Sequence, residues 1–346
     1  MTRKIEGWLA RLSDPAGLNP NWLPQPFAAK EMPQLNDLLD EAGRHNVRPA
    51  LVRNLSLVLR SAPDTLIAGP PEAIEPAKLL LLARANELRL LDVARAVVLA
   101  DIARDLLDLA AKAGLPVALV KGADFAQAAY GGLHNRTFTD VDLLIRRDAE
   151  PALGDILAGL GFVSQEPPLR HASRTERKWT KAHPHAGTIL VEVHTDMVHT
   201  PELRRHMSLT YDAYNDPAKG GVTPAARLIM AALHGATSHL FARLQYVVDG
   251  LMIARLGVDA KELAERAKLA GARLALATTL RLATEIYGCP HSRELFETLK
   301  PVPWSRVERR IMTAALVISS KGPQRWRLLP RRYLYRGLLQ LADGRA

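Results

Sequence analysis

The chain contains a single cysteine, Cys289, among its 346 residues. An internal disulfide is therefore excluded, and a reducing compartment is favoured. No apolar run reaches the about 18 residues of a membrane-spanning helix, so none is expected. The N-terminus, MTRKIEGWLARLSDPAG, also lacks an apolar core of signal-peptide length. Together these absences predict a cytoplasmic protein.

Several well-known catalytic patterns are absent too. We find no strong phosphate-binding glycine loop, dinucleotide fingerprint, zinc ribbon or serine nucleophile elbow. Internal repeats and low-complexity tracts are also missing. What remains is an ordinary globular composition, with 48% hydrophobic and 24% charged residues. Its length allows about two or three domains.

Acidic residues are scarce at the C-terminal end. Residues 301–346 hold ten Lys or Arg but only two Asp or Glu, so this segment carries +8 of the net charge of +10. Here Trp326, Tyr333 and Tyr335 alternate with arginines, a pattern typical of a nucleic-acid or anionic surface. The alternative, which we favour, is a terminal amphipathic helix that packs its leucines and leaves its arginines solvated. The packed leucines would be Leu328, Leu329, Leu334, Leu338 and Leu339.

Periodicity divides the chain into three regions. Residues 32–56 and 76–114 repeat apolar side chains near every 3.6 positions, which predicts helices joined by a Pro/Gly-rich connection over 61–76. From 115 to 200 short apolar strands alternate with helices, and residues 167–187 are interpreted as a polar, basic connection. Helices return after residue 201. We therefore predict an α+β fold: an N-terminal helical region (1–114), a small mixed-sheet α/β core (115–200) and a C-terminal helical region with a basic tail (201–346).

Single residues are expected to delimit some of these helices. Gly114 should end the N-terminal region and Gly288 a C-terminal helix. Asp148 and Thr223 are predicted as N-caps, each followed by a proline in the first turn.

Asp140 and Asp142 lie one residue apart in an otherwise apolar strand, TFTDVDLLI. Residues i and i+2 of a strand point to the same face, so the two carboxylates repel each other unless a cation lies between them. A bound metal is one interpretation and a solvated strand end is the other. Glu192, in ILVEVHTD, faces away from Val191 and Val193. If the two strands are neighbours, Glu192 completes a cluster of three carboxylates; otherwise it is an outward residue on an edge strand.

Two further features favour an anionic ligand. The strand LPVALVKG ends in Lys121 and Gly122 at the start of a helix, where backbone N–H groups and the lysine can approach phosphate. Arg136, just before the Asp140 strand, could meet a triphosphate with its guanidinium fork. The simpler alternatives are a turn glycine and a surface arginine.

In this order the motifs resemble the nucleotidyltransferase fold of the DNA polymerase beta superfamily, and within it the bacterial family of uncharacterised nucleotidyltransferases. That family's pattern is Lys-Gly, a helix with an aromatic residue, Arg, Asp-apolar-Asp, Gly-aromatic and apolar-Glu-apolar-His, then two histidines and an aspartate. Across about residues 80–290 the matching positions are Lys121, Gly122, Tyr130, Arg136, Asp140–Ile145, Gly161, Phe162, Val191–His194, His234, His239, Asp249 and Gly250.

The resemblance implies an enzyme that transfers a nucleoside monophosphate from an NTP, such as ATP, to a hydroxyl of a small molecule, protein or RNA. Asp140 and Asp142 would bridge two Mg²⁺ (or Mn²⁺) ions about 4 Å apart. Glu192 would hold the ion that activates the acceptor hydroxyl. Lys121, Gly122 and Arg136 would contact the nucleotide.

The chain departs from the wider superfamily at one phosphate contact. Ala123 follows Gly122, where a serine hydroxyl would contact phosphate, and the interval from Gly122 to Asp140 is longer than usual. One alternative is therefore a catalytically degenerate binding or regulatory module, possibly for nucleic acid. Another is a basic helical RNA-binding protein whose acids are incidental. The three acids favour the enzyme, since an inactive site gains nothing from three carboxylates that repel one another.

Two histidine pairs remain. His183 and His185 have no neighbouring cysteine or acid in the sequence, so a loop role is favoured over a zinc site. His234 and His239 lie five residues apart on a predicted α-helix and would not share a face well, which favours packing over catalysis.

Overall fold

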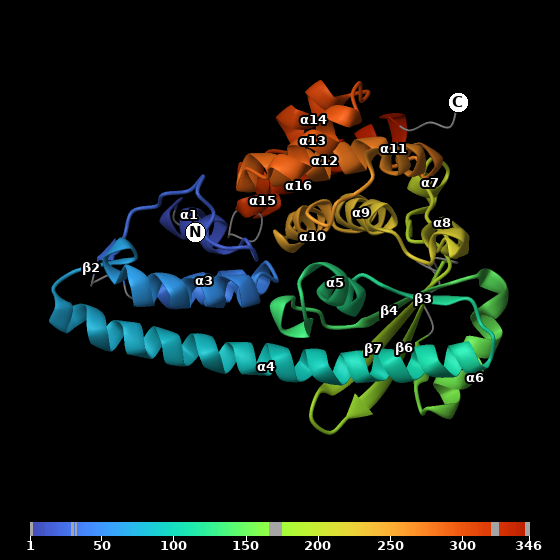
Figure 1. Cartoon of the computed structure of the whole chain (residues 1–346), viewed down its shortest axis with the longest axis horizontal. Helices are drawn as coiled ribbons and strands as arrows, with labels where there is room; N and C mark the ends of the chain where they lie inside the picture. The colour runs from blue at the N-terminus through green and yellow to red at the C-terminus, as the bar shows by residue number, and fades with distance from the viewer. Residues whose placement is uncertain (1–2, 29–30, 32, 166–174, 320–324, 343–346) are drawn as a thin grey trace.

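The computed structural model describes residues 3–28, 31, 33–165, 175–319 and 325–342. The main sheet has five strands. Figure 1 shows one long helix, α4, that runs past both this sheet and the N-terminal helices. C-terminal helices cover the opposite side. The predicted α+β class is confirmed, whereas the domain boundaries near residues 114 and 200 stay predictions.

The N-terminal region is helical, as predicted, with a two-residue parallel pairing between its loops. Helix α4 begins earlier than expected and runs through Pro76. The proposed connection over 61–76 is therefore too long. Buried Ile74 and Leu81 anchor this end of the helix in the core, which compensates for the hydrogen bond that Pro76 lacks. The elements are α1 (Arg3–Leu12), β1 (Phe27–Ala28), α2 (Pro33–Arg44), α3 (Arg48–Ser61), β2 (Ile67–Ala68) and α4 (Pro71–Lys112).

The sheet has the order β3-β4-β7-β6-β5, with β4 and β7 parallel and the other pairs antiparallel. Strand β6 was not predicted: its segment lies in the stretch interpreted as a connection. Several residues of β6 are charged and only Trp179 of this strand is buried, so the sequence of β6 has little apolar alternation. Residues 167–174 of that stretch lie outside the described part. The elements are β3 (Val117–Val120), α5 (Gly122–Ala129), β4 (Val141–Ile145), α6 (Glu150–Gly159), β5 (Val163–Gln165), β6 (Glu176–His183) and β7 (Gly187–His194).

The two faces of the sheet have different surroundings. Val191 and Val193 pack in a core with apolar residues of α4 and α6, including Leu99 and Leu153. The alternate positions of β4 and β7, which carry Asp142, Glu192 and His194, point to the other face. This confirms the predicted alternation along β7 and turns the polar face toward the C-terminal helices.

The C-terminal region is helical, as predicted. Thr223 caps α9 by accepting a hydrogen bond from the Ala226 N–H at 3.2 Å, and Gly288 ends α12 at φ 67°. Asp148, by contrast, is not an N-cap: it lies within a short 3₁₀ turn before α6. The elements are α7 (Pro201–Arg204), α8 (Tyr211–Tyr214), α9 (Pro224–Leu233), α10 (Gln245–Ala254), α11 (Ala260–Leu269), α12 (Arg273–Tyr287), α13 (Pro290–Thr298), α14 (Ser305–Ile311), α15 (Ala314–Ile318) and α16 (Arg325–Ala342).

The tail helix α16 packs on the body. Tyr335 is fully buried and its hydroxyl donates to Thr278 Oγ1, and Leu338 and Leu339 are buried too. Leu329 and Leu334, which were expected to pack, are exposed. The side chains of Arg325, Trp326, Arg327 and Leu328 lie outside the described part. None of the described helices has the length and apolarity needed to cross a bilayer.

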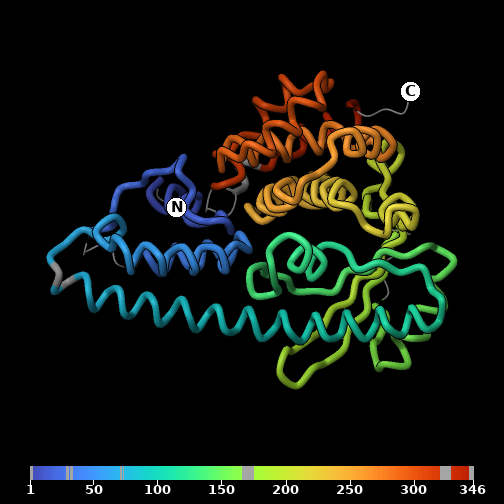
Figure 2. Tube along the Cα trace, viewed as in Figure 1, coloured from blue at the N-terminus to red at the C-terminus, as the bar shows by residue number. Residues whose placement is uncertain are grey.

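The two ends of the chain share one core. Figure 2 shows the N-terminal segment beside the C-terminal helices. Asn19 donates a hydrogen bond to the Ile286 carbonyl, and Ser13 hydrogen-bonds to the Tyr287 hydroxyl at 2.8 Å. Helices from both ends of the chain therefore pack in one body.

Candidate active site

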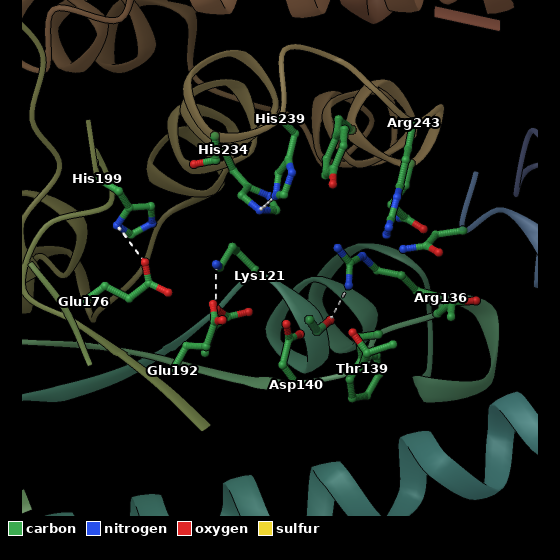
Figure 3. A pocket seen from close by; sticks show the side chains of 18 of the residues that line it. Lys121, Arg136, Thr139, Asp140, Glu176, Glu192, His199, His234, His239 and Arg243 are labelled. Carbon is green, nitrogen blue, oxygen red and sulfur yellow. Dashed lines mark hydrogen bonds and ion pairs between the residues drawn. The ribbon is translucent and has the colours of Figure 1, made fainter. Parts of the chain in front are cut away.

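A cavity of about 290 Å³ lies between the polar face of the sheet and the C-terminal helices. Asp140, Asp142 and Glu192 line it on the side of the sheet, and Figure 3 shows Lys121 between Glu192 and the histidines of the C-terminal helices. All six residues predicted from the sequence as site residues line this cavity: Lys121, Gly122, Arg136, Asp140, Asp142 and Glu192. The structure thus brings together residues that lie on or near three strands, β3, β4 and β7.

The three acids converge because of strand register. Asp142 on β4 is the direct cross-strand partner of Glu192 on β7, and Asp140 comes just before β4. Burial and the nearby charge of Asp142, acting against the opposing charge of Lys121, raise the pKa of Asp140 to about 7. Without a bound cation, Asp140 therefore holds a proton near neutral pH for much of the time.

The cation beside the acids is a lysine. Lys121 is 5% exposed and its Nζ lies 2.5 Å from Asp142 Oδ1. Strand pairing explains this contact, since Val120 is the register partner of Asp142 and Lys121 follows it directly. Burial favours the neutral amine, but the carboxylates outweigh burial and raise the pKa of Lys121. Lys121 stays charged and is the counter-ion of the acid cluster.

A second lysine, Lys178, was missed in the sequence. It is the register partner of Glu192 on β6, and its Nζ lies 2.6 Å from Glu192 Oε1 and 3.0 Å from Glu176 Oε1. Only the strand pairing identifies it, because the surrounding stretch reads as a polar loop. The acid cluster is therefore flanked by lysines on two sides.

Arg136 is buried and faces an acid of the helical region. Its Nε and Nη2 donate to the two oxygens of Asp249 at 2.7 and 2.8 Å, and Nη1 donates to the Gly122 carbonyl at 3.1 Å. Tyr130 and Gln245 donate to the same aspartate. Arg136 thus ties the Lys121–Gly122 turn to α10, and its contact with a triphosphate stays a proposal.

His234 and His239 do share a face, contrary to expectation. Residues His234–Ser238 form a π-helical turn, in which residues five apart come into line. Their Nε2 atoms lie 3.1 Å apart, and the His239 ring stacks on Tyr246 at 4.5 Å between centroids. Both line the cavity, and burial lowers the pKa of each, so both are neutral at pH 7. A π-turn has no clear signal in one sequence, and the α-helical spacing rule failed for that reason.

Two further pairs of histidines have different surroundings. His183 Nδ1 accepts hydrogen bonds from the backbone N–H groups of His185 and Ala186, so this pair closes the β6–β7 hairpin, as a loop role predicts. His194 and His199 line up beside Glu176 at one side of the acid cluster. His194 Nε2 lies 2.9 Å from Asp142 Oδ1.

The acids fit a divalent cation. Oxygen ligands suit Mg²⁺ and Mn²⁺, and a bound cation would offset both the burial and the repulsion from Asp142 that raise the pKa of Asp140. One group of ligand atoms within 4.8 Å of one another comes from Asp142, Glu192 and His194. Beside them, Ala123 is buried and supplies no hydroxyl to a phosphate. The site therefore suits cation binding better than the serine-type phosphate contact.

Comparison with known proteins agrees with this geometry. No curated protein and no solved structure matches the chain. A family model described as uncharacterised nucleotidyltransferase matches residues 33–288, which include every cavity residue named above. The match spans most of the chain, from α2 to the end of α12. The chain therefore belongs to this family of nucleotidyltransferases.

Proposed function

We propose that the protein transfers a nucleoside monophosphate from an NTP to a hydroxyl acceptor, with Mg²⁺ or Mn²⁺ held by Asp140, Asp142 and Glu192. The observation that supports this proposal most is the convergence of three acids from two strands on one cavity. In the reaction the acceptor oxygen forms a bond to the α-phosphorus. The bond to the bridging oxygen breaks, pyrophosphate leaves and the hydroxyl proton passes to solvent. The cytoplasmic location is part of the proposal, and cell fractionation tests it.

The side chains have separate tasks in this proposal. When bound, the divalent ions supply positive charge to the phosphates and lower the pKa of the acceptor hydroxyl. Lys121 leaves Asp142 and contacts a phosphate oxygen, because a metal takes over its role as counter-ion. Arg136 keeps the Lys121–Gly122 turn in place through its contacts with Gly122 and Asp249. On the opposite wall, the His239–Tyr246 stack offers a surface of neutral rings to the nucleotide or acceptor.

The second candidate is a degenerate member that binds a nucleotide or another partner without turnover. Ala123 favours it, because one phosphate contact of the superfamily is missing. The lysine already paired with Asp142 favours it too, because it can replace a metal as counter-ion. The two candidates differ in one measurable product: only the enzyme releases pyrophosphate.

The test is NTP turnover by an isosteric pair of variants. Asp140→Asn removes one charge from the cluster without breaking the buried Lys121–Asp142 pair, and Asp148→Asn, on an exposed turn after β4, is its control. We expect pyrophosphate release and label transfer from α-labelled NTP, with cell extract as acceptor source, to fall at least about a hundredfold in Asp140→Asn. The control should retain wild-type turnover. Equal turnover in both variants would refute the proposal, and NTP binding with no turnover in wild type would support the degenerate module.

A further inference from the structure

Beside the acid cluster, a second group of ligand atoms comes from Glu176, His194 and His199. These atoms all lie within 4.8 Å of one another. Glu176 on β6 is the direct register partner of His194 on β7, and His199 follows in the loop after β7. His199 Nδ1 lies 3.6 Å from Glu176 Oε2, and the two imidazole rings have centroids 5.0 Å apart. Two imidazoles and one carboxylate thus converge from two strands and a loop.

The hydrogen bonding of His194 identifies the nitrogen that can bind. Its Nε2 lies 2.9 Å from Asp142 Oδ1, to which Lys121 also donates, so this oxygen accepts and Nε2 carries the proton. In a neutral imidazole the other nitrogen then has a lone pair. His194 Nδ1 is fully buried and has no hydrogen-bond partner among the described residues. Buried polar atoms are normally satisfied, so this lone pair needs an explanation.

A metal ligand explains it. A histidine that binds a metal through one nitrogen usually donates its other N–H to a carboxylate, which fixes the ring and its tautomer. His194 and Asp142 have this arrangement. Two histidines and one carboxylate with open positions are a common ligand set for zinc or ferrous iron.

We infer that Glu176, His194 and His199 form a binding site for a divalent transition-metal ion such as Zn²⁺, separate from the oxygen site of Asp140, Asp142 and Glu192. The inference does not depend on the proposed function, because it rests on different ligands. His194 alone touches both groups.

Distances and charge permit the ion. With metal–ligand distances of about 2.0–2.2 Å, tetrahedral ligand atoms lie roughly 3.3 Å apart, so the 3.6 Å between His199 and Glu176 needs only a small adjustment. The side chains of Glu176 and His199 are 17% and 22% exposed, so they can rotate around the fixed His194 ring. Lys178 pairs with the other oxygen of Glu176, Oε1, at 3.0 Å, so Oε2 can bind the ion while this ion pair is kept.

The site has an access route. Glu176 and His199 line the main cavity, on the opposite side of Lys121 from Arg136 and Thr139 (Figure 3). Three protein ligands leave at least one coordination position open, and this position would face the cavity. An oxygen atom of a substrate or a water molecule would complete the coordination there.

The test uses Co²⁺ as a spectroscopic probe for the transition-metal site, in excess Mg²⁺ so that the oxygen site is filled. We expect wild-type protein to bind one Co²⁺ per chain with the intense visible absorption of a low-coordinate site, and Zn²⁺ to abolish the band by competition. His199→Gln and Glu176→Gln should each weaken Co²⁺ binding about 10–100-fold, measured by equilibrium dialysis. Circular dichroism should show that both variants are folded.

Two controls separate this site from other binding. Asp140→Asn, in the oxygen site, should keep the Co²⁺ band. The double variant His183→Gln/His185→Gln, in the hairpin turn, should keep it as well. No band in wild type, or an unchanged band in both His199→Gln and Glu176→Gln, would overturn the inference. Neither result would affect the proposed function, since Mg²⁺-dependent turnover is measured separately.

Discussion

The ammonium of Lys121 lies 2.5 Å from Asp142 Oδ1, in the position beside the carboxylates where a cation is needed. The repulsion between Asp140 and Asp142 calls for a cation beside them. In the structure a protein side chain supplies this cation. A divalent ion would then compete with Lys121 for the same oxygen.

Replacing Lys121 should make the fold depend on metal. Lys121→Met leaves buried acids without their counter-ion, and we expect a loss of up to about 3–5 kcal/mol in the free energy of unfolding without metal. Mg²⁺ should restore more stability to this variant than it adds to wild type, because the ion replaces the missing charge. Thermal unfolding with and without Mg²⁺ measures both effects. Lys181→Met, on the exposed side of β6, is the control, and an equal Mg²⁺ response in all three proteins would contradict the prediction.

The Arg136–Asp249 pair should contribute strongly to stability. Asp249→Asn removes the charge that compensates a buried guanidinium, which typically costs about 3–5 kcal/mol. The exposed pair of Arg146 and Asp212, 3.4 Å apart, offers a matched control, and Asp212→Asn should cost about 0–1 kcal/mol. Urea unfolding of the two variants gives the comparison. Similar midpoints for both would show that burial does not matter here.

Acid should destabilise the protein partly through Glu41, which is 1% exposed. Burial favours its neutral form, but hydrogen bonds and charge from His45 and Arg44 outweigh burial and lower the pKa of Glu41. A lowered folded-state pKa gives stability that is present above the unfolded-state pKa and is lost as the pH falls through the folded-state value.

Glu41→Gln should therefore be less stable than wild type at neutral pH, and the difference should shrink below about pH 4. Urea unfolding at neutral pH and at about pH 3 measures it. A difference that does not change with pH would mean that Glu41 acts through packing and not through its charge.

RNA should not bind through the tail helix. Arg332 is 3% exposed and cannot reach a phosphate, and Arg336 lies 3.8 Å from Glu202. Arg331 is exposed, so Arg331→Ala tests the most accessible cation among the described arginine side chains of α16. We expect RNA affinity to be weak and the variant to change its salt dependence by less than about one unit. Tight, salt-sensitive RNA binding that Arg331→Ala weakens would reverse this expectation.

The sequence predicted the strands of the site but not all of their neighbours. A short apolar run located β4 and period-two alternation located β7, and the order of motifs indicated that they meet. Lys178 was missed because β6 carries charges at several of its positions and so shows little apolar alternation. Cross-strand contacts of this kind depend on register, which a single sequence rarely specifies for a polar strand.

Long-range contacts explain the other differences. Arg136 was interpreted from its place before β4, whereas its partner Asp249 lies 113 positions further on. The alignment of His234 with His239 depends on a π-turn, which no spacing rule for α-helices includes. Local periodicity thus predicted the elements, while partners brought together by tertiary packing could not be read from the chain.

Helix α4 constrains how substrates can enter. It spans Pro71–Lys112, about 60 Å at the usual rise per residue. Ile74 and Leu81 near its start lie in the core of the helical body, whereas Leu99 and Leu106 lie in the core behind the sheet. One continuous helix therefore connects the two cores rigidly and opposes a hinge motion of one core relative to the other. We expect the cavity to admit its ligands through rotations of side chains such as Lys121 and Lys178, with little change in the distance between the two walls.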